Sequence, residues 1–335
     1  MKEASSNANQ ALLIALQQGI PLARRPWAEM AGTLGMTEVE VLHAAQNLFT
    51  QGVARRFGGV FDSRHLGYAS TLCAVDVPAH DIERIAELLQ PHPGVTHCYE
   101  REGIPSLWFT LTAQANKLED ELQRVENTLK PYLLLNLPAI RRFKVEVVLD
   151  AAEGDVEPVS DKDAPGTTDV ATPPIFSACE KSLVRKLQGN LSVVDEPFAV
   201  VAQDLKLDIE ELLELLTSWK KSGILRRIGF ILRHRKAGFV ANGMCVWPVA
   251  EADVVRAGKI LAAAPEVTHC YERHASPSVP FNLYAMIHAR EKETAGNIFR
   301  RLGEQAALSN GRMLVSTREF KKTSPVFFLE NEQSQ

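Results

Sequence analysis

The chain has 335 residues, a formal net charge of −4 and a hydrophobic fraction of 45%. This length predicts two or more globular domains, and the slightly acidic balance lacks the basic excess typical of nucleic-acid-binding proteins. The sequence contains no long apolar run and no signal-peptide core, so we expect no membrane contact and a cytoplasmic location.

The cysteines provide a second exclusion. Their number, five, is odd, and no two of them form a Cys-x-x-Cys pair. This spacing argues against a zinc knuckle or a disulfide framework and favours a reducing compartment. Cys98 and Cys270 each follow a histidine but should point to the opposite strand face, so we expect no metal site.

Residues 1–68 are predicted to form a winged helix-turn-helix domain. The helices are expected at 11–16, 27–34 and 38–51, with Thr37 as the N-cap of the third and Gly52 at its end. Residues 53–68 fit two short strands around an Asp-Ser turn, which is the pattern of a β-wing.

Residues 69–150 fit a ferredoxin-like βαββαβ domain. The expected strands are 70–77, 95–101, 106–112 and 140–149, and the expected helices are 81–89 and 116–130. Residues 151–174 are rich in acidic residues and proline and contain no aromatic residue, so they are predicted to be a linker that cannot order itself.

The second half repeats the first. The sequence Thr-His-Cys-Tyr-Glu-Arg at 96–101 recurs letter for letter at 268–273. A run of this composition rarely recurs by chance, so it indicates an internal duplication. The second winged helix-turn-helix is expected at 175–239 and the second ferredoxin-like domain at 240–335. The predicted fold class is therefore α+β, a tandem duplication of these two domains.

The repeated segment carries the candidate chemistry. If it is a regular strand, side-chain alternation places His97, Tyr99 and Arg101 on one face and Thr96 on the other. The second copy repeats this row as His269, Tyr271 and Arg273. An imidazole, a phenol and a guanidinium in a row could serve an anionic ligand that needs a proton donor. The alternative is a half-exposed strand with incidental polar residues, and the letter-for-letter repetition disfavours it.

A helix-turn-helix followed by a ferredoxin-like domain resembles the Lrp/AsnC transcription regulators, which implies DNA binding. A recognition helix normally carries Lys or Arg toward the phosphates. The third helix instead bears Glu38 and Glu40, and its counterpart begins with Asp208, Glu210 and Glu211. We therefore expect no specific DNA operator.

Several motifs together resemble the siroheme decarboxylases, whose enzyme is built from two homologous Lrp/AsnC-like subunits. The motifs are Arg-Arg-x-Gly at 55–58 and 226–229, the downstream Arg-x-x-Gly-aromatic at 64–68 and 235–239, the repeated strand, and its hairpin partners at 105–110 and 279–288. The chain resembles a fusion of the two subunits. Ser106 stands where the family pattern has Asn, which leaves open whether this position has an equivalent role in both halves.

The resemblance implies a carboxy-lyase that removes two acetate carboxylates from siroheme. The product would be 12,18-didecarboxysiroheme, used in haem b or haem d1 biosynthesis. No organic cofactor is expected, because the macrocycle can take up electron density. The substrate is itself an iron tetrapyrrole with many carboxylates, which arginine binds bidentately.

The site residues follow from this reaction. The arginine candidates for carboxylate binding are Arg55, Arg56, Arg64, Arg226, Arg227 and Arg235. His97 or His269 would donate the proton after loss of CO2. Tyr99 and Tyr271 would orient the substrate, and Arg101 and Arg273 would hold a propionate or pair with glutamate. The histidines His65, His274 and His288 are weaker donor candidates, since none is matched by histidine in the other repeat.

Two other functions stay open on the sequence. One is a regulator or tetrapyrrole-sensing binding protein without turnover, and the other is a catalytically silent scaffold that needs a second homologue. The halves are expected to pair through their sheets, with a homo-oligomer as a further option. Whether one half or both turn over is not decided by the sequence.

Overall fold

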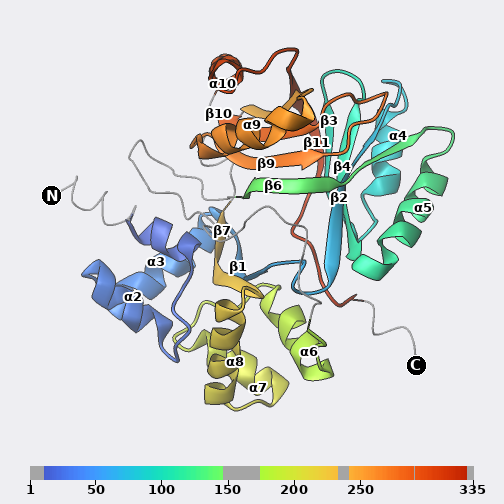
Figure 1. The fold of residues 1–335 in the computed structure, drawn as a ribbon. Coiled ribbons are helices and arrows are strands. Elements are labelled where there is room, and N and C mark those ends of the chain that lie inside the picture. Colours follow the sequence, from blue (N-terminus) through green and yellow to red (C-terminus); the bar gives the residue numbers. More distant parts are fainter. Residues whose placement is uncertain (1–10, 146–173, 233–240, 290, 330–335) are drawn as a thin grey trace.

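The computed structural model describes residues 11–145, 174–232, 241–289 and 291–329 (Figure 1). The first half contains a helix at 11–18, α2 (Pro26–Leu34), α3 (Glu38–Thr50), β1 (Ala54–Phe61), β2 (Tyr68–Val75), α4 (Ile82–Leu89), β3 (Val95–Arg101), β4 (Leu107–Gln114), the 3-10 turn η1 (Ala115–Lys117), α5 (Leu118–Leu129), β5 (Leu134–Leu137) and β6 (Ala139–Val145). The second half contains α6 (Ala178–Leu187), α7 (Pro197–Leu205), α8 (Ile209–Lys221), β7 (Leu225–Leu232), β8 (Ala241–Trp247), α9 (Glu251–Ala263), β9 (Val267–Arg273), β10 (Leu283–Ala289), α10 (Lys292–Gln305) and β11 (Arg312–Lys322). The duplicated plan of helix-turn-helix and ferredoxin-like units is confirmed.

Two parts of the prediction fall outside these residues. These parts are residues 151–173 of the predicted linker and Arg235. Within the described ranges, no helix is both long and apolar enough to cross a membrane.

The acidic residues at the start of α3 and α8 stabilise the N-termini of these helices. The Thr37 side chain accepts a hydrogen bond from the Glu40 backbone, and the Glu40 carboxylate accepts one from the Thr37 backbone, so α3 begins with a capping box. Asp208 caps α8 by accepting from the backbone of Glu210 at 2.8 Å. Negative charge here also interacts favourably with the helix dipole.

The predicted β-wing hairpin of the first repeat is wrong. Strand β1 pairs with β7 of the second repeat in a separate two-stranded antiparallel sheet, and the chain then continues directly into β2. The duplication explains this pairing, because it supplies a partner of matching sequence. Gly58 lies opposite Gly229, and the rings of Phe57 and Phe230 stack with centroids 4.7 Å apart.

The two helix-turn-helix units share one hydrophobic core. The chain after the helix at 11–18 bonds to β7, where the Ile20 amide donates to the Ile228 carbonyl at 2.7 Å. Symmetrically, the Leu191 amide after α6 donates to the Phe57 carbonyl at 2.8 Å. A Cβ on Gly58 would lie 2.4 Å from the Gly189 carbonyl oxygen, so only glycine permits this close approach.

The ferredoxin-like halves form one nine-stranded sheet in the order β5-β2-β4-β3-β11-β8-β10-β9-β6. The prediction that 140–149 closes the first sheet is wrong, because β5 closes it and β6 crosses to pair with β9. Pro138 separates β5 from β6 and has no amide hydrogen for a continuous ladder. In return, β11 pairs with β8 through its first residues and with β3 through the rest.

The crossing strands β6 and β11 also attach to helices of the opposite half. The Lys144 ammonium donates to the Ala264 carbonyl at 3.0 Å, at the C-terminal end of α9. The Lys321 ammonium donates to the His92 carbonyl at 2.8 Å, just beyond α4. A cation at a helix C-terminus is favoured by the helix dipole, so both contacts join the two halves. The expectation that the halves pair through their sheets is therefore confirmed.

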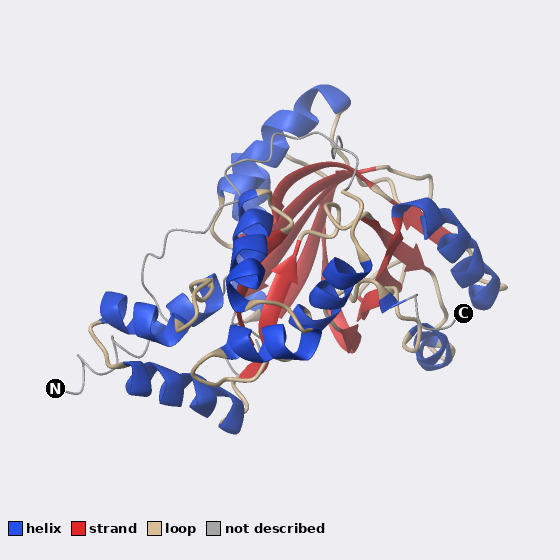
Figure 2. Ribbon diagram, turned by 90° about the horizontal axis from the view of Figure 1, so that it is seen from below, coloured by secondary structure: helices blue, strands red, loops and turns tan. Residues whose placement is uncertain are grey.

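Figure 2 shows helices flanking the sheet, and α4, α5, α9 and α10 supply residues to the two cores on its outer faces. Cys98 and Cys270 are fully buried in the cores under these helices, on the face opposite the motif histidines. On the inner side, the two halves of the sheet meet around Trp108, Tyr284 and Leu314. The motif rows thus lie in the region enclosed between the two halves.

The question left open at Ser106 is answered by matching contacts. The Ser106 hydroxyl accepts from the Val77 amide at 3.0 Å and donates to the Val77 carbonyl at 2.9 Å. In the second half, Asn282 accepts from the Val249 amide and donates to its carbonyl, both at 2.8 Å. The two side chains therefore perform the same structural role.

The strand crossing predicts how the protein behaves after cleavage. A cut within residues 151–173 should leave both halves in one particle, because β6, β11 and the β1–β7 pair hold them together. Gel filtration and native mass spectrometry after insertion of a protease site there would test this. Two separately eluting fragments under native conditions would contradict it.

Candidate active site

A β-bulge shapes each motif strand. Val95 and His97 lie opposite consecutive residues of β4, so Thr96 is an extra residue, and Thr268 has the same place in β9. A bulge disturbs the regular alternation, and each threonine hydroxyl reaches the following imidazole. The Oγ1–Nδ1 distance is 3.0 Å for Thr96 and His97 and 2.9 Å for Thr268 and His269. The prediction that Thr96 faces away from His97 is wrong.

The predicted row of histidine, tyrosine and arginine is present in both halves. The His97 and Tyr99 rings stack with centroids 6.3 Å apart, and the His269 and Tyr271 rings do the same. The Arg101 guanidinium lies 5.3 Å from the Tyr99 ring centre, and the Arg273 guanidinium lies 4.7 Å from that of Tyr271.

The arginines at the ends of the rows also link the halves. Arg101 donates to the Leu314 carbonyl at 3.1 Å, and Arg273 donates to the Leu137 carbonyl at 2.8 Å. Burial lowers the pKa of Arg101 to about 10. The two arginines therefore bind the backbone of the opposite half, in addition to any role toward a ligand.

Both motif histidines are neutral at neutral pH. Burial first, and then nearby cations, lower the pKa of His97 and of His269 to about 4. The cations are Lys322, Arg55 and Arg101 for His97, and Arg273 and Arg226 for His269. His97 also acts on His269, since a proton on His97 disfavours a proton on His269.

The structure separates the arginine pairs of β1 and β7. Arg55 is near His97 and donates to the Lys322 carbonyl at 3.2 Å. Arg56 points to the other side of β1, where it donates to the carbonyls of Gln188 and Gly59. The register of the β1–β7 pair shifts at Arg55 and again at Arg226, so these two residues stand outside the regular ladder. Arg226 and Arg227 of β7 are divided in the same way, with Arg226 near His269 and Arg227 beside Gly19. Of these four arginines, the geometry therefore favours Arg55 and Arg226 as ligand contacts.

A buried carboxylate organises the cations of the second row. Asp62 is only 5% exposed and accepts from Arg64 at 3.0 Å and from Arg226 at 2.7 Å. Burial acts to raise the pKa of Asp62, but these hydrogen bonds outweigh it and hold the pKa well below its usual range. Asp62 is thus a fixed negative charge that orients two of the predicted arginines.

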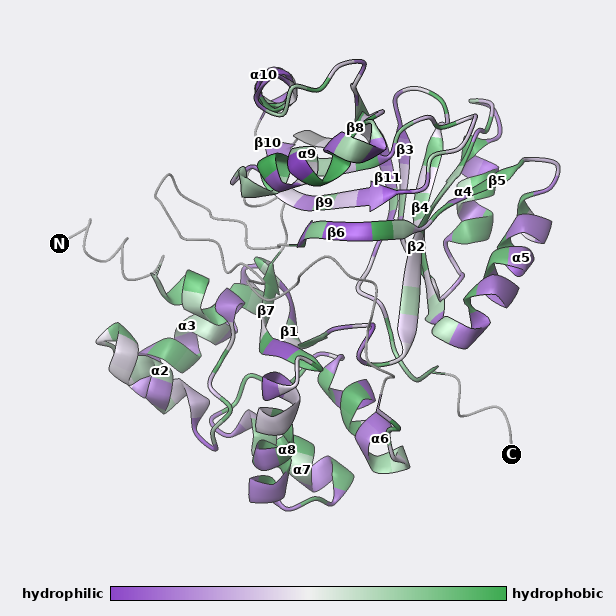
Figure 3. Cartoon of the chain, in the orientation of Figure 1, coloured by the Kyte–Doolittle hydropathy of each residue, from purple (hydrophilic) through white to green (hydrophobic). Residues whose placement is uncertain are grey.

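Sequence reasoning missed the crossing-strand residues next to the motifs. Arg142 of β6 lies opposite Tyr271, and Glu319 of β11 lies opposite Tyr99. Figure 3 shows hydrophilic residues in β6 between more apolar ones. A signal existed, since both halves end in Arg-x-Phe-Lys, at 141–144 and at 318–321. This repeat did not reveal the crossing, because each closing strand was expected to pair within its own half.

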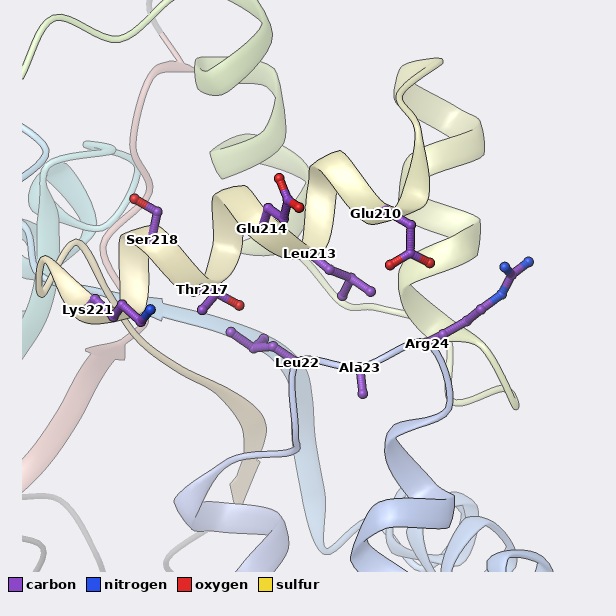
Figure 4. Close-up of a pocket in the computed structure, with 9 residues that line it drawn as sticks. All are labelled: Leu22, Ala23, Arg24, Glu210, Leu213, Glu214, Thr217, Ser218 and Lys221. Atoms are coloured by element: carbon purple, nitrogen blue, oxygen red, sulfur yellow. The ribbon is translucent and has the colours of Figure 1, made fainter.

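A groove on the described surface lies elsewhere. It has a volume of about 570 Å³ and runs between residues 22–24 and helix α8 (Figure 4). Glu210 and Arg24 lie at one end of it, and Lys221 lies at the other. None of the motif residues lines this groove, so the geometry of the histidine rows does not depend on it.

Comparison with known proteins agrees with this division of the chain. Residues 65–144 and 236–321 match the AsnC-like ligand binding domain, and residues 9–55 and 180–226 match the siroheme decarboxylase NirDL-like HTH domain. A siroheme decarboxylase of Hydrogenobacter thermophilus is 36% identical, and the alignment covers 95% of this chain and 94% of the relative. The chain belongs to the siroheme decarboxylase family.

Other members of the family support the fusion interpretation. The siroheme decarboxylase NirDL subunit of Paracoccus pantotrophus is 35% identical over 94% of this chain and 95% of its own. The siroheme decarboxylase beta subunit of Methanosarcina barkeri is 36% identical but covers only 42% of this chain, with 93% of its own length aligned. One half of this chain thus corresponds to one subunit in that relative.

The fold is also that of solved members of the family. A crystal structure of the siroheme decarboxylase NirDL matches with a TM-score of 0.75 and 32% identity, covering 96% of this chain and 94% of that one. A crystal structure of NirDL in complex with an iron-uroporphyrin III analogue matches over the same shares with a TM-score of 0.73.

The lowered histidine pKa values predict a pH-dependent stability. In the ligand-free protein both pKa values are about 4, below the ordinary 6.5. As the pH falls through this range, the unfolded chain therefore binds more protons than the folded protein. The free energy of unfolding should therefore decrease from about pH 7 to about pH 4. The double variant His97→Gln, His269→Gln should show a smaller decrease in urea unfolding followed by circular dichroism. An unchanged dependence on pH would refute this assignment.

Proposed function

We propose that this chain is a carboxy-lyase that removes two acetate carboxylates from siroheme between the paired histidine rows. The observation that carries the proposal is that two identical rows, one from each half, lie in one sheet, and that the arginine of each row binds the backbone of the opposite half. Membership of the siroheme decarboxylase family supports the substrate.

The charge of the site suits a substrate with many carboxylates. Arg55 stands on the side of the first row, and Arg64, Arg142 and Arg226 stand on the side of the second. Arginine pairs with carboxylate through two parallel hydrogen bonds, which fixes orientation as well as charge. The Tyr284 hydroxyl is buried and has no hydrogen-bond partner among the described residues, so it is a further donor for the substrate.

The reaction breaks the bond between the acetate methylene carbon and its carboxyl carbon. CO2 leaves, the bonding electrons remain on the methylene carbon, and a proton must then be added to give a methyl group. His97 or His269 supplies this proton from Nε2, because Nδ1 of each ring is engaged by a threonine hydroxyl. We propose that no organic cofactor takes part, since the macrocycle itself takes up electron density.

The proposal includes no specific DNA operator. Glu38 at the start of α3 pairs with Arg25, and Glu40 completes the capping box. In α8, Glu210 and Glu211 occupy the first turn. Carboxylates at these positions would meet the phosphates of DNA unfavourably.

The proton donors can be identified by product mass. Replacing the acting histidine with alanine should slow decarboxylation by roughly 10²–10⁴ while siroheme stays bound. If each half removes one acetate, His97→Ala and His269→Ala should each stall at a monodecarboxylated product. The measurement is product mass against time under anaerobic conditions, with folding checked by circular dichroism. Full didecarboxylation by the folded double variant at the parental rate would rule out both histidines.

Arg142 and Glu319 provide a matched pair for the binding site. Arg142→Gln removes a cation beside Tyr271 and should weaken siroheme binding by about 1.5–3 kcal/mol. This is roughly tenfold or more in Kd. Glu319→Gln, at the corresponding position beside Tyr99, should not weaken binding. Absorbance titrations with siroheme would test both variants, and equal losses of affinity would count against the proposed placement of the substrate.

A further inference from the structure

A chain of hydrogen bonds leads away from His269 on the side opposite its Nε2 atom. Its Nδ1 lies 2.9 Å from the Thr268 hydroxyl, and the same hydroxyl lies 3.1 Å from Nε2 of His288 on β10. The other contact of this hydroxyl, with the Met286 carbonyl, is longer at 3.5 Å. Thr268 is 8% exposed, and the two imidazoles that its hydroxyl joins are both half-buried.

The first half has the same beginning but a different continuation. The Thr96 hydroxyl bonds to Nδ1 of His97 at 3.0 Å. Val95 lies opposite Leu111, and Thr112 follows Leu111. Val267 lies opposite Ile287, and His288 follows Ile287, so Thr112 and His288 occupy equivalent positions. The Thr112 hydroxyl bonds instead to that of Ser70, at 2.7 Å. Of the two motif histidines, His269 is therefore the one that the described contacts connect to a second imidazole.

We propose that Thr268 and His288 form a proton relay that supplies the Nδ1 side of His269 while its Nε2 proton is transferred to the substrate carbon. The proposal rests on the proposed function and adds to it, since it assigns a proton path to the second half. Thr268 and His288 act through His269, so they are positioning residues.

The relay conserves protons and charge at each step. Before transfer, His269 carries its proton on Nε2, Thr268 donates to Nδ1, and His288 in its protonated form donates to Thr268. As the methylene carbon takes the Nε2 proton, the Thr268 proton moves to Nδ1 and the His288 proton moves to Thr268. His269 and His288 both end neutral. After the product leaves, a proton from solvent adds to Nε2 of His269. The Nδ1 proton then returns to Thr268 and the Thr268 proton returns to His288, which restores the protonated His288.

The surroundings of His269 explain why such a relay is useful. Burial lowers the pKa of this ring most, and His97 of β3, Arg273 of its own strand and Arg226 of β7 lower it further, so the imidazole is neutral. A neutral imidazole that loses its Nε2 proton without replacement would become an anion, which is costly in a buried site. Simultaneous protonation of Nδ1 avoids that species.

Two substitutions of His288 distinguish proton transfer through this residue from a hydrogen bond that only orients Thr268. His288→Thr introduces the residue of the first half and removes the imidazole. His288→Gln keeps an amide N–H that can donate to Thr268 but cannot take up and release a proton. We expect both variants to bind siroheme with parental Kd and to lose roughly tenfold or more in the single-turnover rate at the second half, less than the roughly 10²–10⁴ for loss of the donor itself. Their solvent deuterium isotope effect should also differ from that of the parent.

The control is Thr112→Val, which removes the hydroxyl at the matched position of the first half and should leave rate and isotope effect unchanged. A parental rate in His288→Gln would overturn the relay and leave only a hydrogen bond that orients Thr268. Loss of siroheme binding in either His288 variant would also overturn it. The proposed function fails separately, if folded His269→Ala and His97→Ala together retain full activity.

Discussion

The crossing of β6 and β11 between the halves is the constraint on which the rest of the structure depends. In an isolated ferredoxin-like half, each motif strand would be an exposed sheet edge with unpaired backbone groups. The crossing strand of the opposite half covers that edge and brings a lysine to the end of the opposite helix. Because each motif strand is enclosed by residues of both repeats, the site cannot form in one half alone.

The same crossing creates the asymmetry between two rows of identical sequence. The residues next to the motif come from β6 in one case and from β11 in the other, so Arg142 faces one tyrosine and Glu319 faces the other. Asp62 with its two arginines adds further charge on the side of His269. The two rows share the chemistry of histidine and tyrosine but differ in the charge that surrounds them.

Burial determines the protonation state of the site. The histidines are half-buried and stand among cations, which favours the neutral imidazole. Such a ring is a weak acid unless a partner stabilises the charge that proton transfer creates. The bulge at each threonine provides the first part of that partner, and His288 extends it in the second half only.

The sequence by itself determined the duplication, most of the helices and strands, and the identity of the motif residues. Its repetition at 96–101 and 268–273, the helix caps and the apolar periodicity all depend on neighbours along the chain. The tertiary structure decided which strands pair, because pairing between the repeats involves partners that are far apart in the sequence and similar to one another. It also decided that Thr96 turns toward His97, that Arg55 and Arg56 serve different sides, and that Arg142 stands beside Tyr271. Local pattern cannot distinguish a strand that closes its own sheet from one that crosses to an equivalent sheet, since both satisfy the same backbone hydrogen bonds.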